Sequence, residues 1–134
     1  MLSLLVAGFV MGCSGSGPQR AEVSGTVKLN GELVEEGAIS FIPVEGTTGP
    51  QAGEAIRKGT YHIARAKGVV VGKNRVQLVA FRKSGKKIQD PTKLPGVLTD
   101  ERVQAFPPEY NTESTLVREI KPDGNIIDFE IDTK

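Results

Sequence analysis

His62 is the only histidine in the chain, and it lies between Tyr61 and Ile63. A histidine beside a tyrosine hydroxyl and nearby carboxylates could act as the general base of a small hydrolase. A general base needs a partner that positions it, and the sequence offers no convincing partner for His62. Residues 22–134 contain neither a Gly-x-Ser-x-Gly nucleophile elbow nor a glycine cluster that ends in Lys-Ser or Lys-Thr. We therefore expect no catalytic residues, and a small hydrolase is the second alternative.

Metal-binding residues follow no recognised spacing. With a single histidine and a single cysteine, the sequence has no His or Cys pair, and no acidic loop has the spacing of calcium ligands. Asp128, Glu130 and Asp132 would share one face of a strand and could form an acidic binding strip or a weak cation site. Such alternation is more typical of a solvated face that keeps a sheet edge soluble. The sequence thus predicts neither a metal nor a cofactor.

Phe106 and Tyr110 are the candidate ligand-binding residues. They belong to residues 83–111, which contain four prolines and little periodicity, so we expect a long loop there. The two rings could form a platform for a carbohydrate or protein ligand, although we favour rings that pin the loop onto the body. The start of this stretch, residues 82–93, is basic. It could lie against the acidic residues 119–132 or meet anionic lipid headgroups.

The only cysteine, Cys13, follows an apolar run over residues 1–12 that carries no charge. Residues 10–13 read Val-Met-Gly-Cys and resemble the lipobox of bacterial lipoproteins, in which the cysteine receives a diacylglyceryl group. This resemblance implies a lipoprotein signal peptide over residues 1–12 and lipidation of Cys13. Residues 13–21 then form a flexible tether. We expect a protein of the cell envelope, anchored on the extracytoplasmic side of a membrane, either periplasmic or at the outer membrane.

The remaining chain alternates apolar and polar residues with a period of two, which indicates short strands. Residues 22–29 show this pattern and lead into Asn30-Gly31, a dipeptide favoured in tight hairpin turns. Further strands are predicted over residues 38–44, 60–65 and 75–81. Near the end, residues 114–120 and 126–131 flank Lys-Pro-Asp-Gly-Asn, which predicts a second hairpin. No window shows sustained helical spacing with caps.

Several of these segments resemble the carboxypeptidase regulatory-like, or transthyretin-like, domain. The resemblance rests on residues 23–31, 37–41, 59–61 and 67–76, whose order and spacing follow the strand and turn motifs of that family. Residues 106–116 also resemble the P-x-x-Y-x-x-x-S-T-L segment of short lipoproteins from planctomycete-type bacteria. The resemblance implies a seven-stranded antiparallel β-sandwich over residues 22–134, used as an accessory or binding module without peptidase activity.

Length and charge agree with a single binding domain. The chain has 134 residues and a formal charge of +1, which suits one domain and argues against a nucleic-acid partner. We therefore expect a non-catalytic, lipid-anchored module that acts by binding or structural contact at the envelope. Its expected partners are the membrane, through lipidated Cys13, and an envelope protein or glycan. The first alternative is a carbohydrate- or protein-binding accessory domain that uses residues 83–111.

Overall fold

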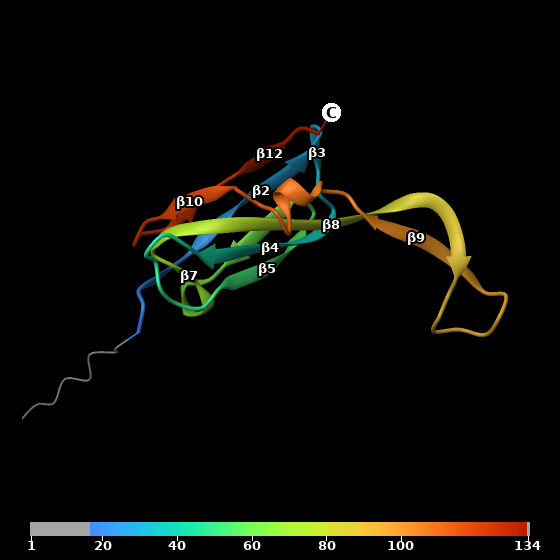
Figure 1. Cartoon of the computed structure of the whole chain (residues 1–134), viewed down its shortest axis with the longest axis horizontal. Coiled ribbons are helices and arrows are strands. Elements are labelled where there is room, and N and C mark those ends of the chain that lie inside the picture. The colour runs from blue at the N-terminus through green and yellow to red at the C-terminus, as the bar shows by residue number, and fades with distance from the viewer. Residues whose placement is uncertain (1–16, 134) are drawn as a thin grey trace, which may run out of the picture.

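The computed structural model describes residues 17–133, which form an all-β fold (Figure 1). The strands are β1 (Arg20–Ala21), β2 (Val23–Leu29), β3 (Glu32–Leu33), β4 (Glu36–Pro43), β5 (Ala52–Arg57), β6 (Thr60–Ile63), β7 (Val69–Val70), β8 (Gly72–Gln89), β9 (Leu98–Gln104), β10 (Val117–Ile120), β11 (Asn125–Ile126) and β12 (Phe129–Ile131). Two 3₁₀ turns are also present, η1 (Arg65–Lys67) and η2 (Pro108–Tyr110). No α-helix occurs among the described residues, so the all-β prediction is confirmed.

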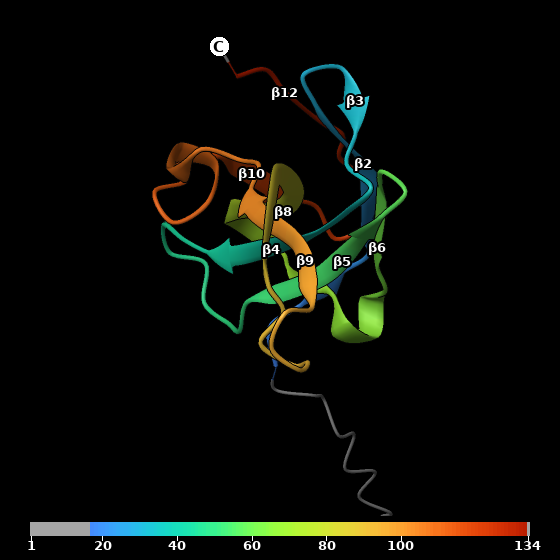
Figure 2. The ribbon, with the colours of Figure 1, turned by 90° about the vertical axis from the view of Figure 1, so that its right-hand side faces the viewer.

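One long sheet curls over itself to give the body two facing layers (Figures 1 and 2). Its strand order is β10-β8-β4-β5-β6-β2-β11, with β3 and β12 also paired to β2 and β9 paired to β8. The sheet turns over between β5 and β6, which meet at Arg57 and Thr60. This is the predicted β-sandwich, largely antiparallel, although β11 and β12 run parallel to β2. The structure has more strands than the expected seven, and most of the additional strands are only two residues long.

Aromatic rings join the two layers in the core. Phe41 of β4 faces Tyr61 of β6 with their ring centroids 6.3 Å apart, and Tyr61 faces Phe129 of β12 at 6.4 Å. Aliphatic side chains at alternate positions fill the remaining core, as the period-two pattern predicts. They include Val23, Val27, Ile39, Ile56, Ile63, Val76, Leu78 and Ile120, each at most 1% exposed.

The predicted turn at Asn30-Gly31 is confirmed. Both residues have positive φ, 53° and 82°, and β3 returns antiparallel along β2 from this point. Asn30 also uses its side chain, because its Oδ1 accepts a hydrogen bond from the Thr133 amide at 2.7 Å. The turn is thereby tied to the end of the described chain.

The second predicted hairpin is wrong. The strand at residues 117–120 pairs with β8, whereas β11 and β12 pair with β2 in the opposite layer. The turn between them forms, since the Asn125 side chain bonds the backbone of Lys121 and Asp123 and also the Glu22 carbonyl. It carries the chain from one layer to the other. The sequence therefore predicted the turn correctly, but packing between the layers decides which strands pair.

The folded body begins slightly earlier than expected. Arg20 and Ala21, assigned to the tether from the sequence, form β1 against β7, and Ala21 is fully buried. The signal-peptide assignment over residues 1–12 and the lipidation site Cys13 lie outside the described residues. Among residues 17–133, no helix is long and apolar enough to cross a membrane.

The long proline-rich loop predicted over residues 83–111 is also wrong for most of its length. Strand β8 continues to Gln89, and β9 returns from Leu98 to Gln104, so the segment is an antiparallel ribbon. Pro91 and Pro95 lie in the turn between these strands, and Pro107 and Pro108 lie at η2, where no ladder hydrogen bond is needed. The prolines thus mark the ends of the ribbon.

Candidate functional site

The most distinctive feature is a ribbon that projects from the body, here called the arm, residues 81–104 (Figures 1 and 2). Strand β8 has 18 residues, and its pairing with β4 ends at Ala80. Beyond Ala80 its only partner in the described chain is β9, from Phe81 opposite Gln104 to Gln89 opposite Leu98. Every residue of β8 from Phe81 to Gln89 is exposed. The arm therefore has two solvent-facing sides and no core of its own.

A bulge bends the arm near its root. Lys83 faces Arg102, but the next pair is Lys87 with Asp100, so three residues of β8 oppose one residue of β9. Gly85 in this bulge has a φ of 91°, a left-handed conformation that glycine adopts without strain. Such a bulge interrupts the ladder and bends the strand, as Figure 1 shows for the outer part of β8.

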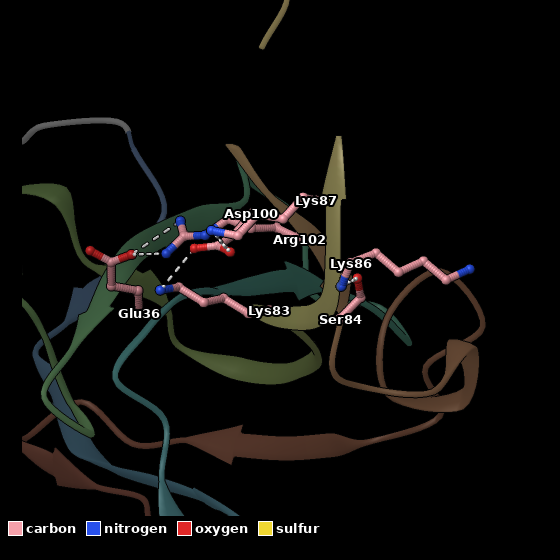
Figure 3. A network of polar contacts seen from close by, with 7 residues as sticks. All are labelled: Glu36, Lys83, Ser84, Lys86, Lys87, Asp100 and Arg102. Atoms are coloured by element: carbon pink, nitrogen blue, oxygen red, sulfur yellow. Dashed lines mark hydrogen bonds and ion pairs between the residues drawn. The ribbon is translucent and has the colours of Figure 1, made fainter. Parts of the chain in front are cut away.

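Charged side chains lie on one side of the bend (Figure 3). Asp100 accepts from Lys83 and from Lys87, each with an N–O distance of 3.0 Å. Hydrogen bonds from Lys87 and Lys83 hold the pKa of Asp100 below its ordinary value. Arg102 lies 3.4 Å from Glu36 of β4 and so connects the arm to the body. The Lys86 side chain extends away from this cluster (Figure 3).

The tip of the arm is an ordered turn that presents apolar side chains. Asp90 Oδ1 accepts from the amide and the hydroxyl of Thr92 at 2.9 and 2.6 Å, which lowers the pKa of Asp90. The side-chain amide of Gln89 stabilises the turn, because it donates to the Leu94 carbonyl and accepts from the Gly96 amide. The exposed apolar residues of the tip are Ile88 at 44%, Leu94 at 79%, Val97 at 39% and Leu98 at 59%.

A second feature is an open groove at the base of the arm, here called the root groove. It encloses about 560 Å³ between residues 32–36, which include β3, and the first residues of the arm. Its apolar lining includes Leu33 and Phe81, which are 47% and 54% exposed. Glu32, Glu35 and Glu36 add negative charge, and Arg82, Lys83 and Arg102 line the arm side. Of these three glutamates, Glu36 has its charge partner in Arg102.

Phe106 and Tyr110, predicted to bind a ligand or pin the loop, lie just before η2 and at its end. Phe106 is 2% exposed and belongs to the core, and the half-buried Tyr110 packs against that core. Phe106 therefore already has the contacts that pinning requires, and a ligand would have to displace it. A shallow hollow of about 460 Å³ adjoins the Phe106 segment. Ligand binding by these two residues stays a prediction.

The residues of the hydrolase alternative do not converge. Tyr61 is 3% exposed, and its hydroxyl donates to the Ile127 carbonyl at 2.6 Å. Burial, with a smaller contribution from Asp128, raises the pKa of Tyr61 well above its ordinary range. His62 is on the opposite face of β6, with Nε2 3.2 Å from a Glu22 carboxylate oxygen. A tyrosine held in the core and an outward histidine share no substrate position.

The acidic residues near the end of the chain have local partners. Asp128 accepts from the Thr26 amide at 2.8 Å and from its hydroxyl at 3.1 Å. Glu130 lies 3.8 Å from Lys28 across the sheet. Within the described residues, no three His, Cys, Asp or Glu side chains come together as metal ligands. These carboxylates thus bond to the neighbouring strand β2.

Sequence reasoning missed both the arm as a ribbon and the root groove. The basic run at residues 82–93 was the available signal for the arm, but it gave no strand pattern. Comparison with known proteins adds no further assignment: no family model, curated protein or solved structure matches this chain. The candidate site therefore rests on its own geometry.

Proposed function

We propose that this protein is a lipid-anchored, extracytoplasmic β-sandwich module that binds a protein partner through its arm and has no catalytic role. The arm carries the proposal. A two-stranded ribbon is marginally stable by itself in water, and exposed apolar side chains in a cluster are characteristic of interaction sites. The arm combines both features, since every residue of β8 from Phe81 to Gln89 is exposed and the tip presents Leu94 and Leu98.

The chemistry of the tip favours a protein partner over a glycan. The arm has one exposed aromatic residue, Phe81, at its root, and no aromatic residue follows it up to Ala105. The tip therefore offers no flat ring on which a sugar could stack. The exposed apolar side chains of the tip are aliphatic and lie among lysines. Burial of aliphatic surface against apolar surface is favourable in water, and lysines at the margin favour an acidic partner.

The position of the arm is compatible with an anchor at Cys13. Strand β1 pairs with β7, which immediately precedes the start of β8, whereas the tip lies beyond the other end of β8 (Figure 1). A tether that enters at β1 leaves the tip uncovered. The proposal therefore gives the two ends of the molecule different roles, one for attachment and one for binding.

The anchor is tested by the intact mass of the full chain, produced in a bacterium and extracted from its membranes. We expect a mature species that starts at Cys13 and carries a diacylglyceryl group. The variant Cys13→Ser should lose this mass and leave the membrane fraction. An unmodified chain that retains residues 1–12 in the soluble fraction would contradict the anchor.

The binding role is tested with a photo-crosslinking amino acid placed at Leu94 in the full chain, within living cells. We expect a discrete protein adduct from this position. The matched control places the same group at Glu54, an exposed residue of β5 in the body, and should give none. An absence of any protein adduct from Leu94 contradicts the proposed function.

A further inference from the structure

We propose that the partner of the arm is a second copy of this chain, with two arms lying antiparallel and the tip of each seated in the root groove of the other. This inference rests on the proposed function, because it names the partner of the same site. The argument starts from an apolar tip and an apolar groove within one molecule, both exposed. The apolar tip of one copy could cover the apolar groove of another, which would remove both surfaces from water.

The tip and one side of the groove also have complementary charge. Lys93 lies in the tip and Lys86 in the bulge behind it, whereas Glu32 and Glu35 line the β3 side of the groove, and none of these four takes part in an ion pair within residues 17–133. Arg82, Lys83 and Arg102 line the arm side, where Lys83 and Arg102 are already paired with Asp100 and Glu36. Seating the tip against the β3 side of the groove brings Lys93 close to the two glutamates, with Lys86 further back along the same arm. Complementary charges at an interface fix the register of the partners and speed their encounter.

The groove cannot be filled by the tip of its own arm. At about 3.3 Å per residue, the strand from Lys83 to Gln89 spans roughly 20 Å, which holds the tip away from the root. The same strand pairs with β9 on both sides of the bulge, so it does not fold back. A tip that occupies a root groove must therefore come from another molecule.

Two-fold symmetry makes the contact reciprocal. If the tip of one copy meets the root groove of its partner, a two-fold axis between the arms generates the second contact at once and closes the assembly. The arms then lie alongside each other. Asp100 neutralises part of the charge of Lys83 and Lys87, which lowers the repulsion between two basic arms. An axis along the membrane normal lets both tethers reach one leaflet.

The test is disulfide formation between two differently tagged full chains in the same membrane. One chain carries Leu94→Cys at the tip, and the other carries Leu33→Cys in the root groove. We expect a mixed disulfide dimer from this pair on mild oxidation. The control pair, Leu94→Cys with Glu54→Cys, should give at most a tenth of that yield, since Glu54 lies outside the groove.

Charge reversal sharpens this test without touching the cysteines. Lys86→Glu with Lys93→Glu on the tip chain should reduce the disulfide yield about tenfold. Glu32→Lys with Glu35→Lys on the groove chain should restore it. All four positions are exposed, so the variants should fold, which circular dichroism checks. Failure of the restoring pair overturns the assignment of these four residues to one interface.

The outcomes separate this inference from the proposed function. If the adduct at Leu94 is a different protein, self-pairing is overturned and the binding role of the arm survives. A lipid adduct without any protein adduct overturns both, because the tip would then contact the membrane. A ladder of ever larger disulfide-linked products, with both cysteines on every chain, also overturns the closed two-fold pair.

Discussion

Strand β8 consists of two halves with opposite surroundings. The strand pairs with β10 from Gly72 to Arg75 and with β4 from Asn74 to Ala80, and every second residue from Asn74 on is buried, including Leu78 at 0% exposure. From Phe81 to Gln89 it pairs with β9 alone, and all its residues are exposed. A single strand thus belongs first to a core and then to a ribbon in water.

The difference shows what maintains each half. The inner half gains from burial of aliphatic side chains, at about 25 cal/mol per Å² of apolar surface removed from water. The outer half has ladder hydrogen bonds and exposed ion pairs, which contribute little to stability. We expect the arm to open locally far more often than the body, as do segments with few buried contacts. A binding partner would supply the burial that the arm lacks.

The largest predicted contrast comes from truncating one aliphatic residue in each half. Leu78→Ala should lower the free energy of unfolding by about 2–5 kcal/mol, because it leaves a cavity in the core. Ile88→Ala, in the arm, should change it by less than about 0.5 kcal/mol, because Ile88 is already 44% exposed. Urea unfolding at low protein concentration measures both. Similar losses for the two variants would mean that the arm packs like the body.

Two serines give a smaller contrast of the same kind. Ser114 is 4% exposed and donates its hydroxyl to the Val76 carbonyl of the inner half. Ser114→Ala should cost about 1–3 kcal/mol, since a buried acceptor loses its partner. The exposed Ser84 donates to the half-buried Glu101 at 2.8 Å, so Ser84→Ala should have almost no effect on global unfolding. Urea unfolding measures the free energy of unfolding of both variants. A loss for Ser84→Ala as large as that for Ser114→Ala would contradict the account.

The smallest effect concerns pH and the arm alone. The folded pKa of Asp100 lies below its ordinary value of 3.8, because Lys87 and Lys83 donate to the carboxylate. A carboxyl with a lowered folded pKa stabilises the fold above its unfolded pKa, and this contribution is lost as the pH falls through the folded value. Backbone amide shifts of residues 83–87 should therefore change as the pH falls below 3.8.

Asp100→Asn is the control for this titration. It should remove the change at residues 83–87 and leave any change at the tip, where Thr92 lowers the pKa of Asp90. The backbone amide shifts of residues 76–80 in the body should show no such change with pH, because these residues do not contact Asp100. A titration of residues 83–87 that persists in Asp100→Asn would assign the effect to another group.

The sequence predicts most of the longer strands of the body, although not β5, because alternate residues of these strands lie in the core. Val23, Val27 and Leu29 follow a period of two, and Asn30-Gly31 carries the turn chemistry of a tight hairpin. The arm shows no such period, since both of its faces meet water and Ile88 is the only large apolar residue between Arg82 and Gln89. A ribbon without a core leaves no hydrophobic pattern to find.

The candidate site was even less accessible to sequence reasoning. The root groove combines residues 32–36 with residues of β8 and β9, which are distant in the chain and meet only through sheet pairing. The failed hairpin near the end has the same cause, because Phe129 pairs with Val27 of β2 whereas β10 pairs with β8 in the other layer. Such partners are set by packing between layers, which local spacing does not encode. Phe106 was selected as an aromatic residue, yet its burial depends on that same packing.

The central claim is that the arm is completed by a partner copy, and amide hydrogen exchange as a function of protein concentration tests it most directly. Amides of Val76–Ala80 should be strongly protected at every concentration. Amides of Lys86–Gln89 should exchange fast in the dilute monomer and become protected as the concentration rises. Protection of the arm amides equal to that of the body amides in the dilute monomer would contradict the account, as would arm exchange that never slows with concentration.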